Sequence, residues 1–149
     1  IEEGESEPIV GVVHDENARA MGGVAGHAGL FSTSTDLARF AQCLLRIGEG
    51  SGDEIISPEV WDEVMARDLE SAASDRWLGW CGVSPDGFLA DTFSQRAFGH
   101  TGFTGTGLWI DFARGRAWTL LTNRIHPTRH FDSGIIALRR AVGDLINGD

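Results

Sequence analysis

The sequence predicts an α+β fold, an antiparallel sheet meander with flanking helices. Three short apolar runs follow one another at 97–106, 108–110 and 117–122, with turn residues between them, which is the pattern of an antiparallel meander. Apolar residues then recur at helical spacing over about 132–147. Such a helix lies on one face of a sheet in a two-layer arrangement. The length of 149 residues fits a single unit, 1–149.

The composition is that of a packed globular domain, with 42% hydrophobic and 23% charged residues. The net charge of −10 disfavours nucleic acid and anionic membrane surfaces as partners, because both need a basic patch. No apolar run approaches the ~20 residues of a membrane span. All 12 basic residues are arginine and tyrosine is absent, so this chain cannot supply a lysine base or a tyrosine acid.

The first third of the chain is expected to be a loop, an irregular glycine-rich run and a helix. Residues 1–8 are acidic and polar, as in a loop or a frayed end. The glycines of 21–29 favour irregular backbone that makes close approaches. Thr33 followed by Asp36 has the spacing of a capping box, and the helical pattern that begins there stops at Gly48.

The middle of the chain is expected to hold a second helix, one strand and a loop. Ser57 before Pro58 is typical of a helix start. Residues 68–76 are interpreted as a polar link, 77–83 as a strand and 84–96 as a loop. The residues that the second helix turns inward are expected to be Val60, Trp61, Val64 and Met65.

The last helix, over about 132–147, is expected to begin at a side-chain cap, either Asp132 or Ser133. Its apolar residues form one stripe that would lie on a face of the sheet. The stripe consists of Ile135, Leu138, Val142 and Leu145.

Two stretches carry a resemblance to a known family. One is Gly26-His27-Ala28-Gly29-Leu30-Phe31-Ser32-Thr33 with the following Asp36-Leu37-Ala38-Arg39-Phe40, and the other is Phe98 to Thr106 with the later Asn123-Arg124. They resemble the glycine-rich loop, the helix start and the third motif of the serine β-lactamase-related family, which includes class C β-lactamases, DD-peptidases and esterases. The resemblance implies a partial β-lactamase/transpeptidase-like fold without a metal or other cofactor. It also implies a periplasmic or extracellular location, although residues 1–149 contain no signal peptide.

The same resemblance implies a serine hydrolase that works through an acyl-enzyme. The family uses Ser-x-x-Lys for the nucleophile and base, Tyr-x-Asn for a proton shuttle, and a Lys-Thr-Gly or His-x-Gly strand. Only the third motif has a match, at His100-Thr101-Gly102, because lysine and tyrosine are absent. The chain therefore resembles the C-terminal half of such an enzyme, and we expect it to be inactive alone.

The third motif gives four candidate catalytic residues. His100 would donate a hydrogen bond or carry a proton, as histidine does near neutral pH; the alternative is a strand histidine facing solvent. Thr101 would offer its hydroxyl to the substrate, or would only favour the strand. Gly102 would keep the strand open to a ligand. Phe103 would give its backbone N–H to the oxyanion hole, with its ring packed.

Other polar residues have less defined roles in this interpretation. Asn123 and Arg124 would bind a substrate carboxylate or cap the last helix. His126 and His130 have the His-x-x-x-His spacing of some zinc sites, but Pro127 disfavours a helix there, so no metal is assigned. The polar residues His14, Asp15, Glu16 and His27 are expected to hold the glycine-rich loop. Cys43 and Cys81 are interpreted as buried free thiols, with a disulfide as the alternative.

Two hypotheses of function follow. The first is a hydrolase of amide, lactam or ester carbonyls in small or peptide-like substrates, and the His-Thr-Gly form favours an esterase or a peptidoglycan-related hydrolase over a true β-lactamase. The second is a non-catalytic ligand-binding or interaction module. In the resembled family, N-terminal strands pair beside the C-terminal meander and the final helix packs with an N-terminal helix. The resemblance therefore implies that this chain exposes a strand edge and an apolar helix face, and such surfaces tend to bind a partner. We therefore expect self-association or pairing with an N-terminal half.

Overall fold

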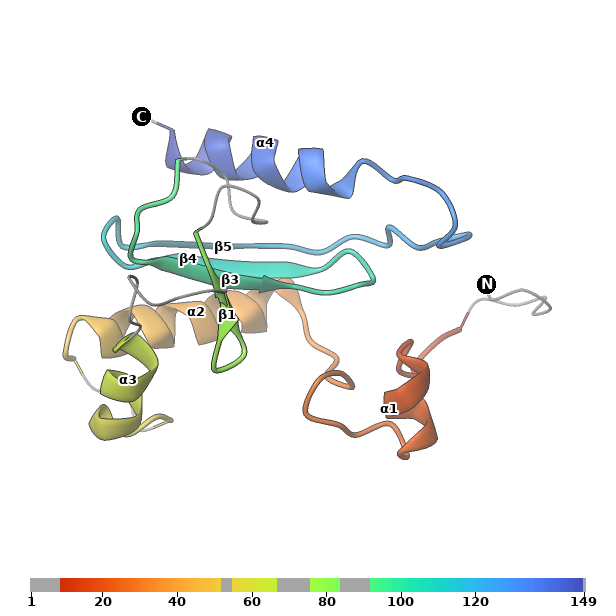
Figure 1. The fold of residues 1–149 in the computed structure, drawn as a ribbon, viewed down its shortest axis with the longest axis horizontal. Helices are drawn as coiled ribbons and strands as arrows, with labels where there is room; N and C mark the ends of the chain where they lie inside the picture. Colours follow the sequence, from red (N-terminus) through yellow and green to blue (C-terminus); the bar gives the residue numbers. More distant parts are fainter. Residues whose placement is uncertain (1–8, 52–54, 67–75, 84–91, 149) are drawn as a thin grey trace.

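The computed structural model describes residues 9–51, 55–66, 76–83 and 92–148. Its helices are α1 (Glu16–Ala20), α2 (Ser34–Gly48), α3 (Pro58–Met65) and α4 (Ile135–Asn147). Its strands are β1 (Arg76–Trp77), β2 (Trp80–Gly82), β3 (Ala97–Thr101), β4 (Gly107–Asp111) and β5 (Arg116–Leu120). The strands form one antiparallel sheet in chain order, with α4 on one side and α2 and α3 on the other (Figure 1). The predicted α+β class is confirmed, whereas the interpretations of 1–8, 68–75 and 84–91 lie outside the described residues.

The meander of β3, β4 and β5 is confirmed, but the strand predicted over 97–106 is too long. Strand β3 ends at Thr101, and residues 102–106 form a tight turn into β4. The N–H of Gly102 donates to the carbonyl of Thr106 at 2.9 Å, and the N–H of Gly105 donates to the carbonyl of Gly102 at 3.1 Å. Gly105 has a φ of +103°, a conformation that only glycine adopts readily. These bonds close the turn and end the strand.

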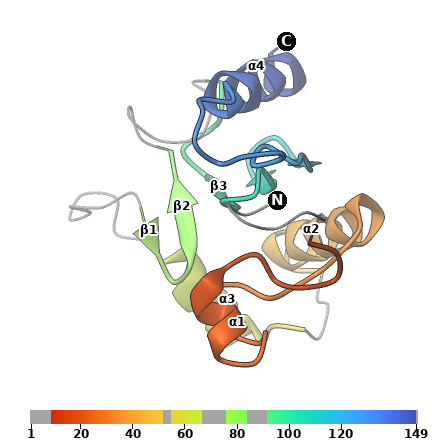
Figure 2. The ribbon, with the colours of Figure 1, turned by 90° about the vertical axis from the view of Figure 1, so that its right-hand side faces the viewer.

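The single strand predicted over 77–83 is in fact a hairpin of β1 and β2. Its two turn residues, Leu78 and Gly79, have φ values of +41° and +84°, and positive φ at both positions belongs to the hairpin turn that matches strand twist. Apolar residues on both sides of this turn gave the appearance of one run. Strand β2 then pairs with β3 and joins the hairpin to the meander (Figure 2).

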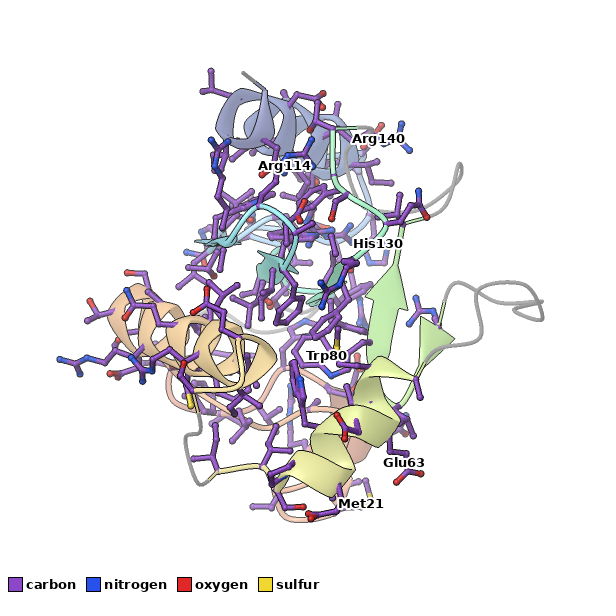
Figure 3. The ribbon with its side chains drawn as sticks, turned by 90° about the vertical axis from the view of Figure 1, so that its left-hand side faces the viewer. Met21, Glu63, Trp80, Arg114, His130 and Arg140 are labelled. Atoms are coloured by element: carbon purple, nitrogen blue, oxygen red, sulfur yellow. The ribbon has the colours of Figure 1, made fainter. Side chains whose placement is uncertain are left out.

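The larger core lies between the sheet and helices α2 and α3. Phe98 and Ile110, which are cross-strand partners, pack there against Leu44 of α2 and Trp61 of α3. Trp80 of β2 contacts the Phe98 ring at 4.6 Å between centroids, and it lies between the sheet and the helices (Figure 3). Successive strand residues point to opposite faces, so alternate residues of β3 and β4 build this core.

The opposite face of the sheet holds a smaller core beneath α4. Trp109 of β4 stacks on its cross-strand partner Trp118 with 4.0 Å between ring centroids. Phe93 and Ala97 pack against Trp109. The sequence interpretation of the tryptophans as core residues is confirmed for Trp61 and Trp109, which are buried.

The N-terminal part contains a short helix, α1, that the sequence analysis did not identify. Asp15 caps it by accepting the N–H of Ala18. The glycine-rich run that follows is irregular, as predicted, with positive φ at three of its glycines. Helix α2 begins at the predicted cap, because Thr33 Oγ1 accepts the N–H of Asp36 at 3.2 Å and donates to its carboxylate at 3.1 Å.

Helix α3 begins at the predicted Ser57 cap, whose hydroxyl accepts the N–H of Val60. Of its four residues expected to face inward, Trp61 is buried and Val64 and Met65 are half-buried. The expectation for Val60 is wrong, because its side chain is 51% exposed. Val60 lies one residue before Trp61, and a single helical step turns it away from the core.

Helix α4 begins at Ile135, later than the predicted 132, and neither Asp132 nor Ser133 is its N-cap. The N-cap is Gly134 at a φ of +67°, with no side-chain cap. The predicted stripe is right for Ile135, which is buried, and in part for Val142, which is half-buried, but wrong for Leu138 and Leu145, which are 46% and 84% exposed. The residues that face the sheet are Ile135, Arg139, Gly143 and Asn147. Each of these residues is four positions from the next, so all of them lie on one face of the helix. The guanidinium of Arg139 is part of this face.

Candidate functional site

His100 lies at the exposed end of β3, and both of its ring nitrogens have hydrogen-bond partners. Nδ1 is 2.9 Å from the carbonyl oxygen of Thr101, and Nε2 is 3.2 Å from Nη1 of Arg76. A guanidinium can only donate. Nε2 therefore accepts from Arg76, and Nδ1 carries the hydrogen that the Thr101 carbonyl accepts. In this arrangement the Nε2 lone pair is turned toward a permanent positive charge.

Arg76 is a site residue that the sequence analysis missed. It stood at the end of a segment interpreted as a polar link, 24 residues before His100. The hairpin brings the two together, because Arg76 is opposite Cys81 and Cys81 is opposite Gly99. The two adjacent turn residues Leu78-Gly79 were the signal that could have indicated the hairpin and hence this contact.

The edge of β3 beside His100 and Thr101 has no strand partner among the described residues. Strand β2 pairs only with Gly99 and Phe98, whereas β4 pairs with β3 along its whole length. Thr101 is half-buried and, by strand alternation, lies on the face opposite His100. An extended ligand could therefore add to β3 at this point through backbone hydrogen bonds.

The turn 102–106 is held from below by the buried side chain of Arg139. One guanidinium nitrogen of Arg139 donates to the carbonyls of Gly102 and Thr106 at 3.1 and 2.8 Å. Burial lowers the pKa of Arg139, and the nearby positive charge of Arg124 lowers this pKa further. A Cβ on Gly102 would lie 2.1 Å from Thr106 Oγ1. A larger residue here would therefore force the Thr106 side chain to move.

Phe103 lies at the tip of this turn, and no acceptor among the described residues is bonded to its backbone N–H. Its ring is 58% exposed, so the expectation of a packed ring is only partly met. The ring contacts Arg124, whose Cζ lies 4.8 Å from the ring centroid, and the imidazole of His14, at 5.7 Å between centroids.

Of the two residues predicted to bind substrate, the structure brings Arg124 to the turn and leaves Asn123 beside it. The N–H of Arg124 donates to the carbonyl of Thr104 at 3.1 Å. No carboxylate of the described residues pairs with the Arg124 guanidinium. Asn123 is exposed and its carbonyl accepts the N–H of His126. The alternative that either residue caps the last helix is wrong, because Gly134 occupies that position without side-chain help.

Of the polar residues predicted to hold the glycine-rich loop, Asp15 and His27 do so, whereas Glu16 pairs with Arg129 and the ring of His14 contacts Phe103. His27 Nε2 lies 3.0 Å from a carboxylate oxygen of Asp15. The N–H of Ala18 and the hydrogen bond with His27 lower the pKa of Asp15. Glu16 is 2.7 Å from Nη1 of Arg129, and this bond lowers the pKa of Glu16. The ion pair ties α1 to the segment between β5 and α4.

Metal and disulfide chemistry find no support in the arrangement of the described side chains. No three His, Cys, Asp or Glu residues of this part of the chain gather closely enough to hold a metal ion. Cys43 and Cys81 are free thiols; Cys81 is buried and Cys43 is half-buried, so the disulfide alternative is wrong. None of the described helices is long and apolar enough to cross a membrane.

Comparison with known proteins adds an independent observation. The family model described as "Beta-lactamase" matches residues 3–142. A relative from Escherichia coli O157:H7, named "Putative D-alanyl-D-alanine carboxypeptidase", is 40% identical over 122 residues, which cover 78% of this chain and 27% of the relative. Relatives of the same name from Salmonella paratyphi B and Salmonella newport are 38% identical over 121 residues, with the same coverage. The chain thus spans about a quarter of the length of these relatives. No solved structure matches it significantly.

Proposed function

Because this chain belongs to the β-lactamase family, we propose that it forms the third-motif wall of a serine hydrolase active site. The family and the names of the relatives support a serine hydrolase type of function. The observation that carries the proposal is that the N–H of Phe103, the residue after His100-Thr101-Gly102, has no acceptor among the described residues. It stands beside an open strand edge, where a substrate carbonyl can approach it.

In the proposed reaction, the serine oxygen of a Ser-x-x-Lys motif attacks the substrate carbonyl and forms a tetrahedral oxyanion. The Phe103 N–H and the N–H of the serine itself donate to this oxyanion. Collapse expels the amine or alcohol and leaves an acyl-enzyme, which water then hydrolyses. One such donor is typically worth about 3 kcal/mol of transition-state stabilisation. The donor on this chain has no effect without the nucleophile, so the chain alone would be inactive.

His100 and Arg76 would together take the place of the motif lysine. Arg76 supplies a fixed positive charge, and His100 supplies a ring that can exchange a proton with the leaving group through Nε2. For Nε2 to donate, the bond that it accepts from Arg76 must first open, and Nε2 must take up the proton that the attacking serine releases. Thr101 and Gly102 would line the edge to which the substrate backbone pairs.

The substrate that suits this wall is a peptide-like molecule with a carboxylate near the scissile bond. Arg124 lies at the turn without an acidic partner among the described residues, and a guanidinium recognises a carboxylate through paired hydrogen bonds. Amides, lactams and esters of this form all fit. The relatives are named for carboxypeptidase action on D-alanyl-D-alanine, and we extend that substrate class to this chain as part of the proposal.

The proposed site needs a second segment, and the chain has surfaces that such a segment could cover. Leu30 and Phe31 of the glycine-rich loop are 101% and 66% exposed, and Leu145 of α4 is 84% exposed. Apolar side chains in this number are seldom left in water. We propose that an N-terminal segment carrying Ser-x-x-Lys and Tyr-x-Asn covers them, or that a second copy of the chain does.

The test uses the longer polypeptide that is encoded when the reading frame is extended upstream of Ile1. A Ser-x-x-Lys and a Tyr-x-Asn in the same frame are expected there. The purified product should hydrolyse D-alanyl peptides or p-nitrophenyl esters, and change of the motif serine to alanine should abolish the activity. Absence of both motifs from that frame would refute the proposal.

A non-catalytic interaction module is the second candidate, and the absence of lysine and tyrosine from the chain favours it. It predicts that the upstream frame lacks the two motifs. It also predicts that the chain binds its partner with no hydrolysis of any of these substrates.

A further inference from the structure

Three segments that are far apart in the sequence meet at the ring of Phe103. The imidazole of His14 stacks on this ring with an interplanar angle of 26°, and the Arg124 guanidinium lies over it. His14 precedes α1, Phe103 is in the β3–β4 turn, and Arg124 follows β5. Aromatic rings at such a separation attract one another, as do a ring and a guanidinium.

The stack acts at a residue of the turn for which the described part of the chain provides no backbone hydrogen bond. Gly102 and Gly105 are held by backbone hydrogen bonds. Thr122 and Arg139 add side-chain bonds to the carbonyls of the turn. The N–H of Phe103 has no such bond within the described residues, and its ring is too exposed to be fixed by burial. The orientation of this residue therefore depends on the two groups that touch its ring.

His14 is itself built into the structure. Its carbonyl accepts a hydrogen bond from Nη2 of Arg19 at 3.1 Å, and the carbonyl of Val13 accepts one from Nε of the same side chain at 3.2 Å. Val13 is buried, and Asp15 caps α1. The imidazole therefore projects from an anchored segment and can hold a neighbouring ring in place.

We infer that His14 is a positioning residue, which fixes the Phe103 turn and, through the shared ring, the Arg124 guanidinium. This inference deepens the proposed function, since the Phe103 N–H is the oxyanion donor there. His14 touches neither the substrate nor the reacting atoms. Its role is to keep the donor and the carboxylate-binding guanidinium in one arrangement before a substrate arrives, which reduces the cost of ordering them.

The experiment uses the full 149-residue chain labelled with ¹⁵N and ¹³C. In the wild type, NOEs are expected between the His14 and Phe103 rings, and the Phe103 amide should be as ordered as those of β3. In His14→Ala, the Phe103 amide should become less ordered and its resonance should shift. In His14→Phe, the order and the resonance of this amide should stay as in the wild type, because an aromatic ring still stacks on Phe103. His130→Ala is the control, because it removes an imidazole that is exposed and is not part of the stack.

A double-mutant cycle measures the contact by urea unfolding. His14→Ala should reduce the folding equilibrium constant about fivefold in the wild-type background, and should have no effect once Phe103 is alanine. Absence of the ring–ring NOEs, or an unchanged Phe103 amide in His14→Ala, would overturn the inference even if a variant proved too unstable for the cycle. None of these readouts requires catalysis. Failure of the longer polypeptide to hydrolyse substrate would therefore refute the proposed function and leave this inference standing.

Discussion

At the scale of single residues, His100 is placed by its neighbours and not by burial. It is exposed, and its ring is held between the carbonyl of Thr101 and the guanidinium of Arg76. An exposed side chain with two hydrogen bonds adds little to the free energy of unfolding. Its geometry is nevertheless well defined, which is what a proton carrier needs.

We therefore expect His100→Ala, made in a polypeptide that carries the upstream motifs, to separate activity from stability. The acylation rate should fall by about 100-fold, the usual worth of a positioned acid–base group. The melting temperature should change by less than about 4 °C, which corresponds to 1 kcal/mol or less. Stopped-flow acylation and thermal melts provide the two measurements. Unchanged acylation with a large fall in the melting temperature would make His100 a structural residue.

A second residue, Asp111, gives a prediction about pH. It is buried at the end of β4 and accepts hydrogen bonds from the N–H and hydroxyl of Ser94 and from the N–H and guanidinium of Arg114. Burial alone would raise the pKa of Asp111, but these bonds outweigh burial and hold the pKa below the ordinary 3.8. Since the folded pKa is the lower one, the stabilisation is complete above the unfolded pKa. It is lost as the pH falls through the folded pKa.

Asp111→Asn should consequently destabilise the chain by about 2–4 kcal/mol at neutral pH, because several donors lose a charged acceptor. The difference from wild type should shrink as the pH falls below about 4. Urea unfolding at pH 7, 5 and 3 measures both effects. If the difference in unfolding free energy between wild type and Asp111→Asn stayed constant from pH 7 to pH 3, the charge of Asp111 would not be what stabilises the chain.

Residue types alone identified the third motif but not its supports. Gly102 and His100 were recognisable because they are adjacent in a short motif. The supports contact the motif from far along the sequence. Arg76 is 24 residues from His100, Arg139 is 37 residues from Gly102, and His14 is 89 residues from Phe103. Long-range contacts of this kind depend on the register of the hairpin and the rotation of a helix. Neither the register nor the rotation can be predicted from the spacing of residues that are close in the sequence.

At the scale of elements, the predicted caps of α2 and α3 were right, whereas the predicted cap and face of α4 were not. The starts of α2 and α3 follow from Thr33 and Ser57, because a cap is a local hydrogen bond. The face that α4 turns toward the sheet contains Arg139, because its guanidinium donates hydrogen bonds to two carbonyls of the 102–106 turn. With Arg139 facing inward, Leu138 and Leu145 of the predicted stripe face solvent, and hydrophobic periodicity cannot reveal this rotation.

Two substitutions on α4 test this rotation. Ile135 is 6% exposed and Leu145 is 84% exposed. Ile135→Ala should cost about 2–4 kcal/mol of unfolding free energy, as for other buried isoleucines. Leu145→Ala should change it by less than about 0.5 kcal/mol. Urea unfolding of the two variants at low protein concentration measures both effects. Equal losses of unfolding free energy would mean that Ile135 and Leu145 are both buried, as the sequence analysis predicted.

At the scale of the whole molecule, the sheet is covered on both faces but several apolar side chains remain in water. They lie on the glycine-rich loop and on the outer side of α4, at Val24, Leu30, Phe31, Ile136 and Leu145. The chain spans about a quarter of the length of its relatives. These surfaces are therefore where we expect another chain to bind.

We predict that the purified 149-residue chain associates with itself or with an N-terminal segment. Light scattering at low micromolar concentration should show a species larger than the 16.1 kDa monomer. The net charge of −10 opposes this only weakly, because salt screens charges beyond about 8 Å. A monomer that melts cooperatively and binds no hydrophobic dye would refute the prediction.

The most direct test of the central claim is covalent labelling, with the 149-residue chain and the polypeptide extended upstream compared side by side. Both are treated with a fluorophosphonate and with a fluorescent penicillin. We expect label only on the extended polypeptide, at the serine of Ser-x-x-Lys, because the chain alone contributes the wall of the site and no nucleophile. Label on the chain alone, at one of its own serines and lost when that serine is changed to alanine, would contradict the account.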